Sequence, residues 1–260
     1  MALAPLEHRF VGPPRAPVVL LLPAAGTRWS MWEPQLPELT RHLRVLRVNL
    51  RGPDGEPPGA TVDAMADAVL DLLKVRRLER VSIVGAALGA AVALTAARKS
   101  PRSVERLGLL SASARTRDPS AWRRRAILAL GSGMPAVVPD ATRSWFTPRF
   151  AQERPDVCAL LARELVAMST HEFAAVATAF ADADLRPALR DIPHPTLVIS
   201  SAHDPEAPPR QGRHLAERLP RCRYAVVSGG AHLVSIERSD RVSGLLLDHL
   251  VGSVSPQMDG

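Results

Sequence analysis

Short apolar runs alternate with helical segments along most of this 260-residue chain, and this alternation limits the possible folds more than any other feature. A strand–helix–strand order builds a parallel sheet with right-handed crossovers. Continuous apolar runs are typical of strands that are buried on both faces. We therefore expect an α/β fold with a mostly parallel central sheet flanked by helices. The predicted strands cover Glu7–Val11 (an edge strand), Val18–Leu22, Val45–Leu50, Val81–Val84, Leu107–Leu110, Thr196–Ser200 and Tyr224–Val227.

The alternation is interrupted once, between Pro119 and Asp184, where only helical patterns occur. This interruption predicts a helical cap, or lid, of residues 119–184. The cap would be inserted into one core made of residues 1–118 and 185–260. A chain of this length can form such a core as a single unit without disulfides. Outside the cap, helices are predicted at Met31–Leu43, from the N-cap Thr61 to Leu73, and at Ala90–Arg98, Arg210–Leu219 and Arg241–Val251.

The charge balance is basic, with a net charge of +7, and all but two of the basic residues are arginine. A basic chain can contact nucleic acid or membranes. However, Arg, Ala and Pro are abundant together, which is typical of a GC-rich coding bias, and no nucleic-acid motif is present. We expect no nucleic-acid partner. One dense cluster is interpreted as a solvated helix face, with an entrance for an anionic substrate as the alternative: Arg115, Arg117, Arg123, Arg124 and Arg125.

Cysteine usage and the apolar pattern predict a cytoplasmic protein. Cys158 and Cys222 lie far apart and in no metal-binding spacing, so neither a disulfide framework nor a metal site is expected. The segment Met1–Phe10 lacks the pattern of a signal peptide. The longest apolar stretch, Pro17–Ala25, is too short to cross a bilayer. We expect no membrane partner and no cofactor, and the oligomeric state stays open.

The segment Val81–Gly89 (VSIVGAALG) carries the clearest functional motif. It reads as a strand, a sharp turn and a helix, and the small residues Gly85 and Gly89 allow the tight turn. This is the pattern of a nucleophile elbow, in which the central residue presents a Ser, Cys or Asp. The central residue here is Ala87, so the nucleophile position is predicted to be vacant.

Two further polar residues follow predicted strands. Asp204 comes directly after one strand and His232 after the next, and the residues between them are enough for one helix and one strand. The chain order of elbow, acid and histidine is that of α/β-hydrolases. A histidine held by a carboxylate is a general base near neutral pH. We therefore expect His232 and Asp204 to form a catalytic dyad.

The sequence resembles the 3-oxoadipate enol-lactonase group of the α/β-hydrolase superfamily. The resemblance covers roughly residues 10–250, including the predicted cap, and it implies an α/β-hydrolase fold and a small-molecule substrate. It is carried by Met31–Pro37 (MWEPQLP), Trp145–Phe150 (WFTPRF), Asp182–Arg186 (DADLR), Pro195–Ile199 with His203–Pro205, and Ala231–Leu233 leading into Ile236–Arg238.

Departures from this group fall at the catalytic machinery. The serine of the group is Ala87, its His-Gly is Pro23-Ala24, and its Arg-Gly-His-Gly is Arg51–Asp54 (RGPD). The resemblance also implies an oxyanion hole formed by the backbone N–H groups of Leu88 and Ala25. Because backbone groups donate there, the hole does not depend on particular side chains.

Three functions are compatible with this pattern. The first is general acid/base chemistry by His232 and Asp204 on a small carbonyl-containing substrate: elimination, isomerisation, cyclisation or water activation. The second is a catalytically silent pseudo-hydrolase that binds a ligand or a protein. The third is an enol-lactonase-like or esterase-like hydrolase whose serine was changed to alanine to trap substrate. Since three sites are altered and not one, the third fits the pattern least.

Several other residues are candidates for the substrate pocket. Thr27 and Ser111 follow predicted strands, although ordinary turn chemistry is the alternative for both hydroxyl groups. Trp32 and Trp145 are expected to line the cap and the pocket. His203 could reach the pocket, whereas surface or loop positions are expected for His42, His194, His214 and His249.

Overall fold

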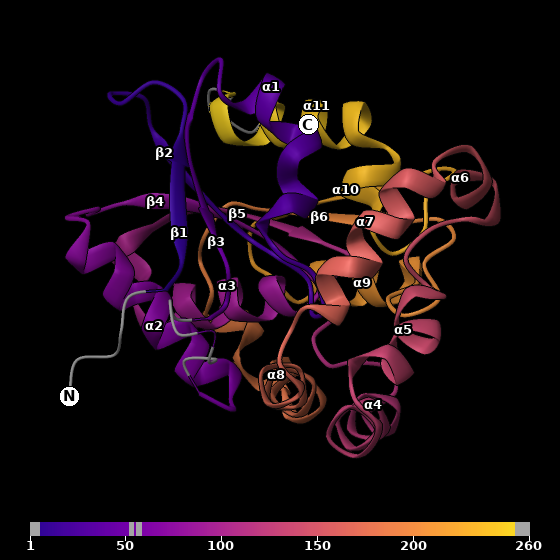
Figure 1. The fold of residues 1–260 in the computed structure, drawn as a ribbon. Helices are drawn as coiled ribbons and strands as arrows, with labels where there is room; N and C mark the ends of the chain where they lie inside the picture. The colour runs from indigo at the N-terminus through magenta and orange to yellow at the C-terminus, as the bar shows by residue number, and fades with distance from the viewer. Residues whose placement is uncertain (1–5, 52–54, 56–58, 253–260) are drawn as a thin grey trace.

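The central feature of the computed structural model, which describes residues 6–51, 55 and 59–252, is one seven-stranded sheet (Figure 1). Its strand order is β1-β3-β2-β4-β5-β6-β7. Only the β1–β3 pair is antiparallel, so the mostly parallel α/β sheet predicted from the sequence is confirmed. The strands are β1 (His8–Val11), β2 (Val18–Leu22), β3 (Arg44–Val48), β4 (Val81–Ala86), β5 (Val104–Leu110), β6 (Thr196–Ser201) and β7 (Cys222–Val227).

Burial along the strands explains the continuous apolar runs. Every residue of β4 and of β6 is buried, because helices cover both faces of a parallel sheet. The edge strand β1 has no fully buried residue, and the prediction of an edge strand there is confirmed.

Helices lie on both faces of the sheet, as Figure 1 shows: α1, α10 and α11 on one side, and α2 and α3 on the other. The N-cap predicted for α2 is confirmed, because the Thr61 hydroxyl accepts a hydrogen bond from the N–H of Ala64 at 3.1 Å. Outside residues 119–184 the helices are η1 (Trp29–Gln35, 3-10), α1 (Leu36–Leu39), α2 (Val62–Val75), α3 (Leu88–Lys99), η2 (Pro101–Ser103, 3-10), η3 (Arg186–Asp191, 3-10), α9 (Pro209–Ala216), α10 (Val234–Glu237) and α11 (Ser239–Val251).

The helix predicted over Met31–Leu43 is wrong. The chain forms the 3-10 helix η1 and then the four-residue helix α1. Proline explains the difference: Pro34 lies inside η1 and Pro37 lies at the start of α1, and neither has an N–H group to donate to a continuous α-helix.

The segment between β5 and η3 consists of helices, which lie together at one end of the molecule in Figure 1. Its two ends meet, because Arg115 and Asp184 form an antiparallel bridge and the N–H of Leu185 donates to the carbonyl of Ala114 at 2.8 Å. None of the helices in the described part of the chain is long and apolar enough to cross a membrane. The five helices of this segment are α4 (Pro119–Ser132), α5 (Met134–Thr142), α6 (Pro148–Glu153), α7 (Pro155–Val166) and α8 (Thr170–Asp182).

Candidate active site

The turn between β4 and α3 has the geometry of a nucleophile elbow. Ala87 lies at the turn with φ 46° and ψ −106°, a backbone conformation that is strained for a residue other than glycine. A Cβ atom on Gly85 would lie 2.2 Å from the carbonyl oxygen of Gly89, and one on Gly89 would lie 2.5 Å from that of Leu22. Only glycine fits at these two positions, as the tight turn in the sequence suggested.

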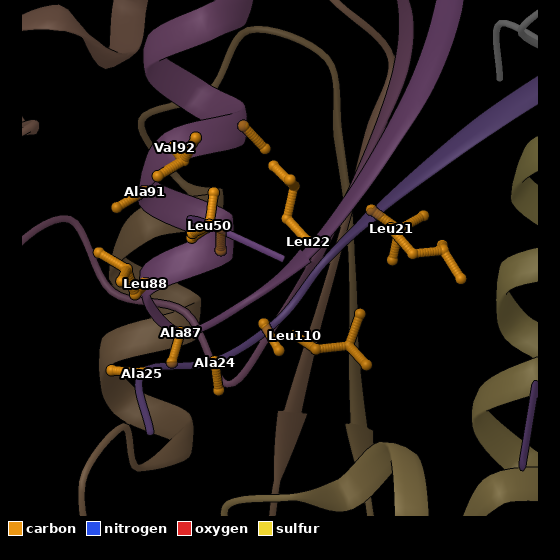
Figure 2. Close-up of a cluster of buried hydrophobic side chains, with 14 of the residues drawn as sticks. Leu21, Leu22, Ala24, Ala25, Leu50, Ala87, Leu88, Ala91, Val92 and Leu110 are labelled. Carbon is orange, nitrogen blue, oxygen red and sulfur yellow. The ribbon is translucent and has the colours of Figure 1, made fainter. Parts of the chain in front are cut away.

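Ala87 itself is 5% exposed and carries a methyl group. Its N–H donates to the carbonyl of Leu110 at 2.9 Å, which ties the turn to the end of β5. Figure 2 shows Ala87 beside Ala24 and Ala25, so small apolar side chains surround the turn. A methyl group can neither attack a carbonyl carbon nor transfer a proton.

Two backbone N–H groups are free to donate next to this turn. Leu88 is the first residue of α3, and the first N–H groups of a helix have no acceptor inside it. Ala25 lies in the loop after β2. Within the described residues, no acceptor is recorded for the N–H of Leu88 or of Ala25, and both residues line the same small cavity. Such a pair of donors can stabilise an oxyanion.

His232 and Asp204 form a direct pair. The distances from His232 Nδ1 to the two carboxylate oxygens of Asp204 are 3.0 and 2.9 Å. Asp204 Oδ1 also accepts hydrogen bonds from the N–H groups of Glu206 and Ala207, both at 2.9 Å. Since β6 and β7 are neighbouring parallel strands, the residues that follow them meet at the same edge of the sheet.

The charges of this pair differ from the sequence-based expectation of a base near neutral pH. Burial alone would lower the pKa of His232, but the charge and hydrogen bond of Asp204 raise that pKa to about 9. The pKa of Asp204 is lowered, because His232 and the two backbone donors outweigh the effect of its burial. The raised pKa favours the imidazolium form of His232 at neutral pH.

Ser111 holds the histidine loop in place. Its hydroxyl donates to the backbone carbonyl of His232 at 2.6 Å, and its own backbone has φ 47°. The N–H of His232 donates to the carbonyl of Ser144 at 3.2 Å, and the N–H of Leu233 donates to that of Trp145 at 2.9 Å. The Ser111 hydroxyl thus holds the backbone of His232 in place. The segment between α5 and α6 holds the same loop through two backbone hydrogen bonds.

The other three predicted pocket residues, Thr27, Trp32 and Trp145, are placed differently. Thr27 lines the small cavity, but its hydroxyl donates to the carbonyl of Ala24 at 2.9 Å. Trp32 is completely buried in the core and is not among the residues that line the cavity. Trp145 does lie close, since its ring reaches within 3.8 Å of a Cβ built on Gly26.

A buried ion pair covers the cavity. Arg28, in the loop after β2, donates to both carboxylate oxygens of Glu172 on α8, at 3.2 and 3.3 Å. The side chains are only 13% and 4% exposed. Nearby, the Ser30 hydroxyl donates to Glu164 at 2.5 Å. We call these contacts between the loop after β2 and the helices α7 and α8 the roof of the site.

The cavity beneath the roof has a volume of about 20 Å³, which is room for about one water molecule. A substrate larger than a water molecule would fit in this cavity only if the roof moved. The cavity is lined by residues 23–28 and by Asn49, Leu50, Leu88, Met168, Glu172 and Val176.

A second charged network joins the helical segment to the loop of Asp204. Arg125 on α4 binds Asp140 at 2.7 Å and Glu206 at 3.0 Å, and the Ser144 hydroxyl also donates to Glu206 at 2.8 Å.

Arg125 is buried, so the interpretation of its cluster as a solvated helix face is wrong for this residue. Two of the histidines expected at the surface or in loops are also buried: His194 and His249.

The sequence analysis did not identify Arg28, Glu172 or Glu206 as site residues. A charged residue is usually exposed, and nothing in the local pattern indicates that these three have partners far along the chain.

Part of the segment Arg51–Asp54 (residues 52–54) lies outside the described residues. His203 is exposed, and within the described residues its side chain forms no hydrogen bond with His232 or Asp204.

Comparisons with known proteins agree with this architecture. Residues 19–245 match the family described as "Alpha/beta hydrolase family". The 3-oxoadipate enol-lactonase 2 of Acinetobacter baylyi is 26% identical over 90% of this chain and 88% of its own length. A putative carbamate hydrolase RutD of Yersinia enterocolitica is 32% identical over 92% and 88%. The crystal structure of the enol-lactonase from Burkholderia xenovorans LB400 superposes with a TM-score of 0.90, at 32% identity, covering 95% of this chain and 96% of that one.

Proposed function

Because this chain belongs to the alpha/beta hydrolase family, we propose that it is an enzyme of that family that works without a side-chain nucleophile. The observation that carries the proposal is Ala87, which keeps the strained backbone of the elbow but offers only a methyl group. An acyl-enzyme needs an attacking oxygen or sulfur. The vacant position therefore leaves acid/base chemistry as the reaction that this site supports.

The proposed reaction is proton transfer next to a carbonyl group. His232 moves the proton, and Asp204 fixes the orientation and charge of its ring. The N–H groups of Leu88 and Ala25 stabilise the enolate oxygen. Removing a proton requires the neutral imidazole, whereas returning one requires the imidazolium. Because the pKa of His232 is about 9, the resting protein at neutral pH is prepared to protonate an enol or enolate.

We further propose that residues 119–184 act as a cap and that the substrate is small. The burial of His232, which is 7% exposed, and the cavity of only about 20 Å³ beside Leu88 and Ala25 support both statements, since the reacting groups are shielded from water. The names of the enol-lactonase relatives suggest small lactones and keto acids as the first compounds to test.

Exchange of deuterium from solvent into these compounds tests the proposal without knowledge of the product. In heavy water, the proton signal next to the carbonyl is followed by NMR. The parent protein is expected to catalyse its loss and His232→Gln is not. The exposed His42 provides a matched control, and His42→Gln should keep the parent rate. Equal rates for the parent and His232→Gln, or ready ester hydrolysis by the parent, would refute the proposal.

Ligand binding without turnover is a second candidate, and the small cavity favours it. A site that is closed in the free protein and lacks a nucleophile suits a sensor as well as an enzyme. This candidate predicts that the parent and His232→Gln both bind a compound of the panel, measured by thermal shift or native mass spectrometry. Neither protein should then catalyse exchange.

A further inference from the structure

A large open cavity lies apart from the closed site. Its volume is about 590 Å³, within the range of about 300–1,000 Å³ that is typical of small-molecule sites. Three segments contribute to it: the loop between β5 and α4, the helix η3 and the helix α9. It is lined by Ser113, Ala114, Arg115, Thr116, Arg117, Pro119, Arg186, Arg210, Gln211, His214 and Leu215.

The charges around this cavity are not balanced. Four of the lining residues are arginines, and no aspartate or glutamate is among the described residues that line it. Arg186 is satisfied by Asp184, which it binds through two nitrogens at 2.8 and 2.5 Å. Arg115, Arg117 and Arg210 have no ion pair within the described part of the chain. Like charges that share a cavity repel one another unless an anion lies between them.

We propose that this space, which we call the arginine cavity, binds a phosphate group of a small molecule. Guanidinium groups that come from separate chain segments can donate to one tetrahedral anion from several directions. A carboxylate is planar and carries less charge, so it would engage fewer of them. The proposal does not depend on the reaction at His232, because none of the lining residues belongs to that site.

A neighbouring cavity limits where the anion can bind. It has a volume of about 390 Å³ and shares Thr116 and Arg117 with the arginine cavity. Its lining includes Asp118 and Glu206 beside Arg117 and Arg125, and Glu206 is paired with Arg125 at 3.0 Å. Carboxylates line this second cavity, and none is among the described residues that line the arginine cavity, so the proposal places the phosphate in the arginine cavity and an uncharged part of the ligand towards Glu206.

Calorimetric titration with pyrophosphate tests the proposal. The ionic strength is kept constant, because salt screens exposed charges. Saturable binding is expected for the parent. Arg115→Gln combined with Arg210→Gln should weaken it about tenfold or more, since each substitution removes a charge-assisted hydrogen bond. Neither residue forms an ion pair within the described part of the chain, so the double variant should fold. Measurement of its thermal unfolding checks this.

Arg102→Gln is the matched control, because Arg102 is exposed in η2, before the start of β5 and thus at the opposite edge of the sheet. It should bind pyrophosphate as the parent does. Absence of saturable binding, or equal weakening by the control, would overturn the proposed site. Tighter binding of citrate than of pyrophosphate, lost in the double variant, would overturn the phosphate assignment in favour of a carboxylate ligand.

Discussion

The elbow and the roof face each other across the cavity, but different forces hold them in place. At the elbow, backbone atoms touch backbone atoms, and Gly85 and Gly89 leave no space for even one added carbon. At the roof, side chains from distant segments meet through charge, as Arg28 and Glu172 do. Steric contact between backbone atoms fixes the first arrangement, whereas rotation of a few side chains can release the second.

This difference indicates which part of the site moves. Close-packed backbone resists displacement, whereas the side chains of the Arg28–Glu172 ion pair can exchange each other for water or for a ligand. We therefore expect the cavity to open by movement of α7 and α8 away from the loop after β2. The elbow and its two free N–H groups should stay fixed during that movement.

Introducing a hydroxyl at the elbow is expected to have the largest effect. Ala87→Ser should be labelled at residue 87 by a fluorophosphonate probe, and the parent should not. The rate should rise on the order of a thousandfold, because removal of a serine nucleophile from a hydrolase has an effect at least that large. Mass spectrometry of the labelled peptide measures the rate of labelling at residue 87.

Labelling of Ala87→Ser should also depend on His232. It should increase with pH towards about 9, because the neutral imidazole must accept the serine proton. The double variant Ala87→Ser/His232→Gln serves as the control and should lose most of the reactivity. If Ala87→Ser remains unlabelled over this pH range, the elbow does not present a hydroxyl in a reactive position. The inference that the elbow keeps a fixed, functional geometry while the roof moves would then be wrong.

A single methyl group tests the rigidity of the elbow. Gly89→Ala places a carbon 2.5 and 2.7 Å from the carbonyl oxygens of Leu22 and Pro23. Since the backbone must shift, we expect the free energy of unfolding to fall by about 3 kcal/mol or more. Gly131→Ala, in α4 with no atom within 4 Å, should be neutral or stabilising. Urea unfolding of both variants measures the difference, and equal stabilities would show that the elbow can adapt.

Breaking the roof should have a smaller effect on stability. Glu172→Gln leaves Arg28 buried without its charge partner, and we expect a loss of about 2 kcal/mol. Hydrogen exchange should become faster in α8 and in the loop after β2, but not at Leu88. Glu38→Gln removes an exposed partner of Arg41 and should change the stability by less than about 0.5 kcal/mol. Faster exchange throughout α3 would contradict the separation of roof and elbow.

A pH-dependent effect on stability compares His232 with His249, a buried histidine on α11. The folded-state pKa of His232 is about 9, above its ordinary value of 6.5. Its stabilising contribution is therefore complete below about pH 6.5 and is lost as the pH rises to about 9. Burial and nearby arginines lower the pKa of His249 to about 4. Its contribution is complete above about pH 6.5 and is lost as the pH falls to about 4.

Urea unfolding across pH 4–10 measures both contributions, and pKa shifts of this size correspond to at most about 3 kcal/mol each. His232→Gln should flatten the alkaline decline, whereas His249→Gln should flatten the acid decline and leave the alkaline side unchanged. If His232→Gln left the alkaline decline intact, the charge state inferred for the His232–Asp204 pair would be wrong.

The order of strands, the elbow and the positions of Asp204 and His232 could be predicted from sequence, because each depends on local pattern. A strand ends where its apolar run ends, and a glycine pair permits a tight turn wherever it occurs. The helix over Met31–Leu43 was predicted wrongly, because apolar spacing was given more weight than Pro34.

The roof and the link from Arg125 to Glu206 could not be predicted, since the partners in each of these ion pairs lie far apart in the sequence. Arg28 and Glu172 are separated by 144 residues. The same limit applies to Ser111, whose hydroxyl is engaged by a carbonyl 121 residues away. Sequence pattern identifies which residues end a strand, but the charge of His232 depends on neighbours that only folding brings together.

The glycine contacts that shape the elbow also have a genetic consequence. They fix the backbone at residue 87 without help from its side chain. Each alanine codon becomes a serine codon by substitution of its first base, so a single nucleotide separates this chain from one with a hydroxyl at that turn. The fold imposes no barrier to that step in either direction. Among chains built on this elbow, gain and loss of the nucleophile are therefore open to one point mutation.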